Sequence, residues 1–310
     1  MAGGSKKAVY AALFGNLGIA ITKFIAAFMT GSTSMFAEAY HSSSDTFNQV
    51  LLLIGIKRSA KVASERHQFG YGKAAFFWAF IVATMIFGVS GVLSMEHGLS
   101  SLLGERHRIE NVSINYIVLA ISFAFETNAL RIAYNLFKST IVARGEKVNY
   151  RTLVTEFQES KDPLIITVMV EDLAALLGIV IAGIGIFLSD ITGNTIFDAL
   201  SSLAIGALLM AFAFFLAREN KGLLLGESIS RNEYRRISEL VASIPEVKSL
   251  VSMRTMHLGM EDVIVGIEVN LVGGLDTGKV ELVIDAIEQK VKQALPYVKA
   301  EHVFVEVQQK

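Results

Sequence analysis

The sequence predicts a bundle of six membrane-spanning helices followed by a small α+β domain. The first observation is composition: 52% of the 310 residues are hydrophobic and 18% are charged, against roughly 25% charged residues in soluble domains. The second is the distribution of charge, which is sparse before about residue 220 and dense after it. The third is a change from long apolar runs to short helical and alternating patterns at the same point. We therefore expect a transmembrane domain over residues 1–220 and a separate domain over residues 221–310.

Six apolar stretches are each roughly 20 or more residues long, the length that an α-helix needs to cross the bilayer core. They are Ala8 to Thr30, Thr33 to Ile56, Ala74 to Met95, Ser113 to Lys138, Pro163 to Leu188 and Ile196 to Ala217. The lipid bilayer is therefore the expected surroundings of the first domain.

Basic residues lie mainly on one side of this arrangement. The loop between the second and third stretches and the loop between the fourth and fifth carry five Lys and Arg residues each. The loops on the other side carry few. Because basic loops stay in the cytoplasm, both termini and the second domain are expected there. No cleavable signal peptide precedes Lys6 and Lys7, so a bacterial inner membrane is the simplest expected location.

The second domain shows two periodicities in turn. Helical spacing of apolar residues predicts helices over Arg231 to Ser243 and Thr277 to Leu295. Alternating apolar residues predict strands over Val247 to His257, over Val263 to Leu271 and from Val303 to the end. The order α-β-β-α-β, with its helices on one face of a small sheet, predicts a ferredoxin-like or metallochaperone-like domain.

Composition also limits the function. The chain has no cysteine, which excludes disulfides and thiolate metal sites and leaves imidazole, carboxylate and amide ligands. The net charge of −1 gives no indication of nucleic-acid binding. A membrane enzyme that uses a metal to activate water is an alternative, but no nucleophile motif or substrate loop supports it, and the protein is not expected to be an enzyme.

The second apolar stretch contains an unusual polar run, His41-Ser42-Ser43-Ser44-Asp45. Four-residue spacing puts His41 and Asp45 on one face of a helix, and Glu38 and Asn48 fall on the same stripe. Ionisable groups at membrane depth are energetically expensive, so they mark a functional site, often an ion or proton path.

The fifth apolar stretch carries Glu171 and Asp172 near its middle and has no basic residue. Carboxylates and an imidazole from two helices repel one another or are neutralised unless a cation joins them. Zinc accepts His nitrogen and carboxylate oxygen in a tetrahedral shell. The sequence therefore predicts a transition-metal site between the second and fifth helices.

Other charged residues in the apolar stretches have simpler interpretations. Lys23, Glu126 and Arg131 are expected to form interhelical pairs or to extend toward the membrane interface. Asp198, beside Asn194 at the start of the sixth stretch, is expected to cap that helix.

At this point the chain resembles the cation diffusion facilitator family of divalent-metal/proton antiporters, most closely its zinc-transporter-nine-like branch. Motifs of that family are similar to the runs Ser34 to Asp45, His67 to Lys73, Glu171 to Ala175, Asp198 to Ser202 and Gly222 to Glu227. The resemblance covers nearly the whole chain. It implies an efflux transporter with alternating access, a homodimer joined through the second domain, and metal ligands at His41, Asp45 and Asp172.

The chain departs from the family at the fourth metal ligand. Relatives place a His or Asp four residues before the fifth-helix Asp, where this chain has Val168. Glu171, Asn48 or a water molecule could complete the shell instead. The extra oxygen ligands leave Mn²⁺ or Fe²⁺ open as substrates beside Zn²⁺.

The family's additional metal sites are weakly represented. The loop after the second stretch keeps only His67, and Tyr71 stands where relatives often have a further His. Candidate ligands in the second domain are His257 and His302, with Asp262 and Glu261 nearby. For that domain, a role in dimerisation is the simpler expectation.

The expected function is zinc efflux driven by proton antiport. Metal binding expels protons because the ligands coordinate in their deprotonated forms, and protons returning from the other side displace the metal. A membrane metal sensor or scaffold that binds without transport is the alternative, and the missing fifth-helix ligand is its main support.

Overall fold

The computed structural model describes all residues except 1, 105–108, 144–146, 160–162, 261 and 309–310. The described chain divides into two compact units. One contains residues 1–54 and 78–220, and the other contains residues 55–77 and 221–310. The grouping of residues 55–77 with the C-terminal unit does not follow from the sequence patterns.

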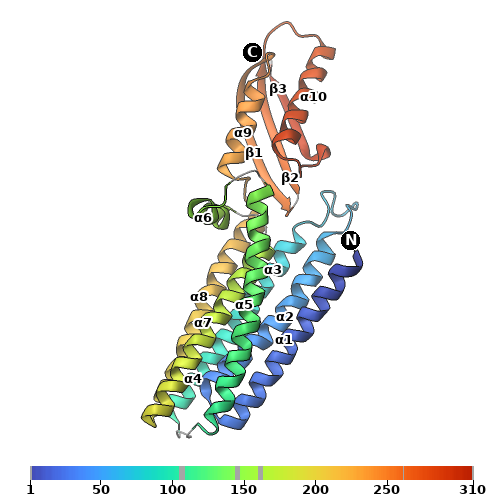
Figure 1. Ribbon diagram of the computed structural model, residues 1–310. Helices are drawn as coiled ribbons and strands as arrows, with labels where there is room; N and C mark the ends of the chain where they lie inside the picture. The colour runs from blue at the N-terminus through green and yellow to red at the C-terminus, as the bar shows by residue number, and fades with distance from the viewer. Residues whose placement is uncertain (1, 105–108, 144–146, 160–162, 261, 309–310) are drawn as a thin grey trace. The chain divides into compact units, whose positions relative to one another are not determined.

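The first unit is a bundle of long helices that run side by side (Figure 1). Its helices are α1 (Ala2–Thr30), α2 (Thr33–Ser59), α3 (Ala74–Met85), α4 (Val92–Leu103), α5 (Val112–Ala143), α6 (Tyr150–Glu159), α7 (Pro163–Thr192) and α8 (Ile196–Leu225). The ends of α2 and α3 that lie within residues 55–77, and the end of α8 after Asn220, belong to the second unit. Among the described residues, five segments are long and apolar enough to cross a membrane. They lie in α1, in α3 to α4, in α5, in α7 and in α8.

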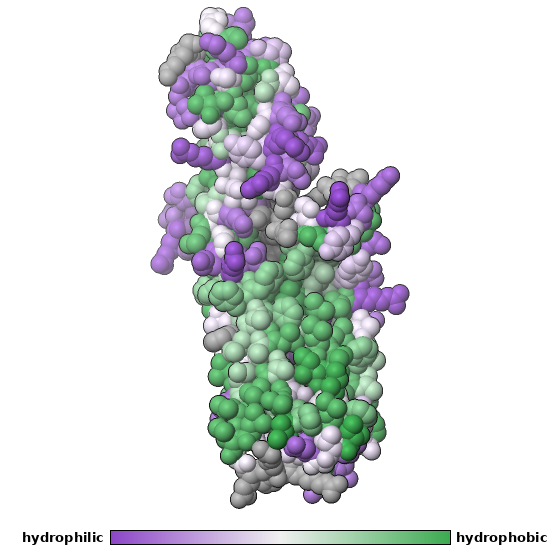
Figure 2. All heavy atoms as spheres, turned by 90° about the vertical axis from the view of Figure 1, so that its left-hand side faces the viewer, coloured by the Kyte–Doolittle hydropathy of each residue, from purple (hydrophilic) through white to green (hydrophobic). Residues whose placement is uncertain are grey.

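The remaining expected span is α2, which has 27 residues and is therefore long enough. It is absent from the set of five because its polar side chains, including Glu38, His41, Asp45 and Asn48, lower its hydropathy. These are the side chains from which the metal site is predicted. In the rest of the helical unit the outward-facing side chains are largely hydrophobic, as Figure 2 shows in green for one face.

The third expected span is not one regular helix. A π-helical segment, η1 (Ile86–Gly91), separates α3 from α4. Such wide turns inside α-helices occur frequently at functional sites. Here Ser90 Oγ donates a hydrogen bond to the Tyr40 carbonyl oxygen at 3.4 Å, one residue before His41. The periodicity of an apolar run cannot reveal one inserted residue, so the sequence did not predict this segment.

Close helix packing in this unit depends on small residues. A Cβ atom added to Gly206 of α8 would lie 2.9 Å from the Met95 backbone nitrogen, and one added to Gly185 of α7 would lie 2.9 Å from the Phe197 carbonyl oxygen. Glycine at these positions lets the backbones approach, as is common between membrane helices.

Asp198 corrects one expectation from the sequence. Rather than capping its own helix, its carboxylate accepts hydrogen bonds at the start of α2, from Ser32 Oγ at 2.9 Å and from the backbone nitrogens of Thr33 at 2.5 Å and Ser34 at 3.2 Å. The hydroxyl of Ser34 also donates to it. A carboxylate there satisfies exposed N–H groups and complements the helix dipole. Asn194 Oδ1 serves α8 instead, by accepting from the Ile196 nitrogen at 3.1 Å.

The second unit confirms the predicted α-β-β-α-β order. Its elements are α9 (Arg231–Ala242), β1 (Val247–Gly259), β2 (Asp262–Leu271), α10 (Thr277–Ala294), a short 3-10 turn (Ala300–His302) and β3 (Val303–Gln308). The sheet order is β1-β2-β3, with β1 antiparallel and β3 parallel to β2. Alternate residues of the central strand, from Val263 to Leu271, are buried in the core between sheet and helices. Ser230 and Glu233 form a capping box that fixes the start of α9.

Candidate metal centre

The predicted ligands on α2 are buried inside the helical unit. His41 is 1% exposed and Asn48 is fully buried, and Asp45 is buried beside them. His41 Nδ1 lies 3.5 Å from Asp45 Oδ1, one helical turn away. This distance is too long for a strong hydrogen bond, so the two side chains are adjacent without being joined to each other.

The predicted ligands on α7 face α2 through one direct contact. Glu171 is buried, and its Oε1 accepts a hydrogen bond from Asn48 Nδ2 at 2.8 Å. Asp172 is partly buried and follows Glu171 by about 100° around the helix. The Asn48–Glu171 bond therefore links the two helices that carry all of the predicted ligands.

Several polar atoms of this group are buried without a hydrogen bond within the described part of the chain. They are both ring nitrogens of His41, Oδ1 of Asp45, Oδ1 of Asn48 and Oδ2 of Asp172. Native proteins rarely leave buried donors or acceptors unsatisfied, because each one costs about 1–3 kcal/mol. Imidazole nitrogen and carboxylate or amide oxygen are ligands for divalent metals, so a cation is a fitting partner.

The side chains as they stand do not form a closed coordination shell. Over the described residues, no group of three or more His, Asp or Glu side chains is close enough to hold a metal ion. In the structure His41 lies next to Asp45, and Asn48 lies next to Glu171. These two pairs and Asp172 do not meet in one group of ligands among the described residues. The ligand set therefore stays a prediction.

A buried ion pair joins α1 to α2 about one turn before His41. Lys23 Nζ of α1 lies 2.8 Å from Glu38 Oε2 of α2, and both side chains are 0% exposed. Gly178 of α7 packs against Glu38, since a Cβ added there would lie 3.5 Å from the Glu38 Cδ. This confirms the expected interhelical pairing for Lys23. Glu38 lies on the same helical stripe as His41 and Asp45, and this position could have identified it as the partner of Lys23.

The other predicted metal residues lie in the second unit, and those that the structure describes do not form a group of three or more ligands. The His67 ring is 4.3 Å from the Tyr71 ring on an exposed loop. His302 Nδ1 lies 2.7 Å from Asp262 Oδ1, while Lys299 Nζ lies 2.9 Å from Asp262 Oδ2. Both oxygens of Asp262 are thus engaged by protein groups. His257 is buried in β1, and Glu261 lies outside the described residues.

Solved structures of MamM C-terminal domains match about a quarter of this chain. A nickel form of a variant of the MamM C-terminal domain matches 26% of this chain and 99% of its own length, with a TM-score of 0.24 and 14% identity. A cadmium form of another variant gives a TM-score of 0.24 and 15% identity over 96% of its length.

Comparisons with curated sequences cover more of the chain. The mitochondrial proton-coupled zinc antiporter SLC30A9 of Mus musculus is 36% identical over 255 residues, which is 82% of this chain and 44% of that protein. The chain thus spans about half the length of these relatives. The magnetosome protein MamB of a Magnetospira strain is 24% identical over 96% of this chain and 93% of its own length.

The family comparison agrees with the helical unit and its polar α2. A profile described as the cation efflux transmembrane domain matches residues 9–225. Because this match covers most of the chain, the protein belongs to the cation efflux family, a family of membrane transporters and not of enzymes.

Proposed function

We propose that this protein exchanges zinc for protons across a membrane, with the metal held by His41, Asp45, Asp172 and Glu171. The observation that carries the proposal is the set of buried polar atoms without hydrogen bonds on α2 and α7. Support also comes from the relatives named as proton-coupled zinc antiporters, which share about a third of their aligned residues with this chain.

The proposed cycle follows from the protonation chemistry of these ligands. Zinc binds when the His41 imidazole is neutral and the carboxylates are ionised, so entry of the metal releases protons. Movement of the helices then exposes the site to the other side of the membrane. Protons arriving there return to the same groups and displace the metal, which couples zinc movement to the proton gradient.

The fourth ligand is assigned from the contact between Asn48 and Glu171. In the structure Asn48 donates to one oxygen of Glu171 and keeps its own amide oxygen free. We propose Glu171 as the ligand, held in position by the amide of Asn48, because a carboxylate is the better zinc ligand. The alternative is that Asn48 is the ligand through its amide oxygen, while Glu171 orients the amide by accepting a hydrogen bond from its nitrogen.

The arrangement in the membrane is also a proposal. Residues 1–220 form the transmembrane domain and residues 221–310 a cytoplasmic domain, with both termini in the cytoplasm. The concentration of basic residues in two loops supports this orientation. Two copies associate as a homodimer through the C-terminal domains. We propose a bacterial inner membrane, as expected from the sequence; the MamB relatives are named as magnetosome proteins and the SLC30A9 relatives as mitochondrial proteins.

Zinc binding to the purified full chain in detergent tests the site directly. Calorimetry should show one tight site per chain, and Asp45→Ala or Asp172→Ala should weaken it at least tenfold. Asp190→Ala is the matched control, because Asp190 is an exposed carboxylate near the end of the same helix, α7. Unchanged zinc affinity in folded Asp45→Ala protein would refute the site, and equal affinity for Mn²⁺ or Fe²⁺ would reassign the substrate.

A further inference from the structure

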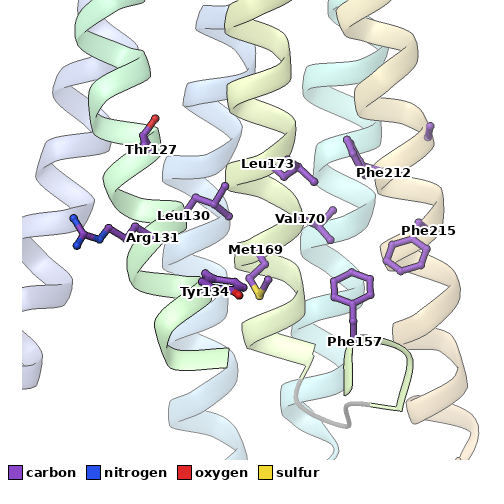
Figure 3. A pocket seen from close by; sticks show the side chains of 11 residues that line it. Thr127, Leu130, Arg131, Tyr134, Phe157, Met169, Val170, Leu173, Phe212 and Phe215 are labelled. Atoms are coloured by element: carbon purple, nitrogen blue, oxygen red, sulfur yellow. The ribbon is translucent and has the colours of Figure 1, made fainter. Parts of the chain in front are cut away.

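An open groove of about 890 Å³ lies in the helical unit, bounded by α5, α7, α8 and one residue of α6 (Figure 3). This volume falls within the roughly 300–1,000 Å³ range of small-molecule pockets. Its wall consists almost entirely of aliphatic and aromatic side chains, among them Leu130, Val170, Leu173 and Phe212. The groove is separate from the proposed metal ligands, which do not line it.

One end of the groove is closed by stacked aromatic rings. Phe157 of α6 lies against Phe215 of α8, with ring centres 6.0 Å apart and planes inclined by 5°. Phe157 also meets Phe137 of α5 edge-on, with centres 6.4 Å apart. The short helix α6 therefore contributes one aromatic side chain, Phe157, to the wall of the apolar groove.

Arg131 and Tyr134, which line the groove, lie in the C-terminal half of α5. Arg131 is 19 residues after the first residue of α5, Val112. This corresponds to about 28 Å along the helix axis, close to the roughly 30 Å thickness of the hydrocarbon core. The adjacent lining residue Tyr134 is exposed, and Tyr is a residue type that is enriched where membrane helices meet the head groups.

Arg131 is the charged residue of the groove. It is exposed, and no ion pair or hydrogen bond of its side chain is found among the described residues. Figure 3 shows its guanidinium turned outward from the rim, while Tyr134 reaches toward Met169. Arginines in membrane-spanning helices pair with other polar groups or extend to the interface, and a guanidinium suits the phosphate oxygens found there.

We propose that the groove binds an anionic phospholipid, with one acyl chain along the apolar wall and the phosphate group at Arg131. An apolar channel and an unpaired guanidinium at its rim match the two parts of such a lipid. The inference concerns lipid binding alone, so it stands or falls independently of zinc transport.

Fluorescence quenching by brominated lipids provides the test. The full chain contains one tryptophan, Trp78, which is replaced by Trp78→Phe before Phe212→Trp introduces a reporter in the groove. The protein is reconstituted in phosphatidylcholine that contains a minor fraction of acyl-brominated phosphatidylglycerol or, in parallel, acyl-brominated phosphatidylcholine. We expect stronger quenching by the anionic lipid at the same fraction.

Charge variants identify the source of the preference. Arg131→Gln should reduce the preference for phosphatidylglycerol about fivefold, the factor that corresponds to about 1 kcal/mol for one basic residue near anionic lipid. Arg131→Lys should retain most of it. Lys138→Gln is the matched control, because Lys138 is an exposed basic residue on α5 that does not line the groove.

Two results would overturn the proposal. One is equal quenching by both brominated lipids, which would show that the head group is not recognised. The other is quenching of the reporter fluorescence by lipid only when the protein is dilute in the bilayer. That result would show that a second copy of the chain covers the groove. Native mass spectrometry of the otherwise unmodified chain checks the result without the reporter: Arg131→Gln should retain fewer phosphatidylglycerol molecules than Lys138→Gln.

Discussion

The buried pair between Lys23 and Glu38 gives a stability prediction of defined size. Both side chains are fully buried and their charged atoms are 2.8 Å apart. Lys23→Met removes the cation and leaves a buried carboxylate with no opposite charge. Breaking a buried pair in this way costs about 3–5 kcal/mol. For a protein of 310 residues, that loss lowers the unfolding temperature by roughly 5–8 °C.

The double variant separates the value of the pair from the cost of breaking it. Lys23→Met with Glu38→Met replaces both charges by apolar side chains of similar volume, which is often neutral or stabilising. We therefore expect the double variant to unfold near the wild-type temperature, although each single variant does not. Gly178 packs closely against Glu38. Glu38 is therefore replaced by Met, whose side chain is slender and flexible.

The assay is thermal unfolding of the purified chain in one detergent, followed by circular dichroism. Lys138→Met is the control for loss of an exposed Lys from the same unit. If Lys23→Met unfolds at the wild-type temperature, the pair is not the buried, unsolvated contact that the structure shows, and the reasoning fails.

Three further predictions concern α2 and the metal site. Asp198→Ala should lower stability by about 1–2 kcal/mol, because a capping carboxylate is lost, and denaturant titration should show a larger loss than for Asp190→Ala. Zinc affinity should be at least about tenfold higher at pH 7.5 than at pH 5.5, since protons compete for imidazole and carboxylates; calorimetry that finds a flat profile contradicts proton release. Glu171→Gln should weaken zinc binding and its pH dependence more than Asn48→Ala does, and the reverse order would make Asn48 the direct ligand.

Much of the fold was predictable because it depends on local patterns. The helices and strands after residue 220 match their predicted positions closely, since one face of each element packs into a single core. The apolar stretches also predicted the long helices. The helix α6 was missed because it is short and lies in a polar loop, and the π segment was missed because it preserves the apolar composition of its span.

The candidate site was predictable only within each helix. Spacing along α2 placed His41, Asp45 and Asn48 on one side, and all three are buried. Spacing says nothing about which atoms meet across helices, so the Asn48–Glu171 and Lys23–Glu38 contacts were not specified. The prediction for Asp198 was wrong for the same reason. Its carboxylate lies at the start of α8 but accepts hydrogen bonds from backbone nitrogens at the start of α2, which lies close in space.

Zinc flux in sealed proteoliposomes tests the central claim most directly. Vesicles contain the full chain and an internal zinc indicator. They are given external zinc, either with a pH gradient that is acidic inside or with no gradient. We expect zinc entry that the gradient accelerates, accompanied by proton movement in the opposite direction. Both should be lost in Asp45→Ala vesicles but not in Asp190→Ala vesicles. Zinc entry that is equal with and without the gradient, or that persists in folded Asp45→Ala protein, would contradict proton-coupled exchange at this site.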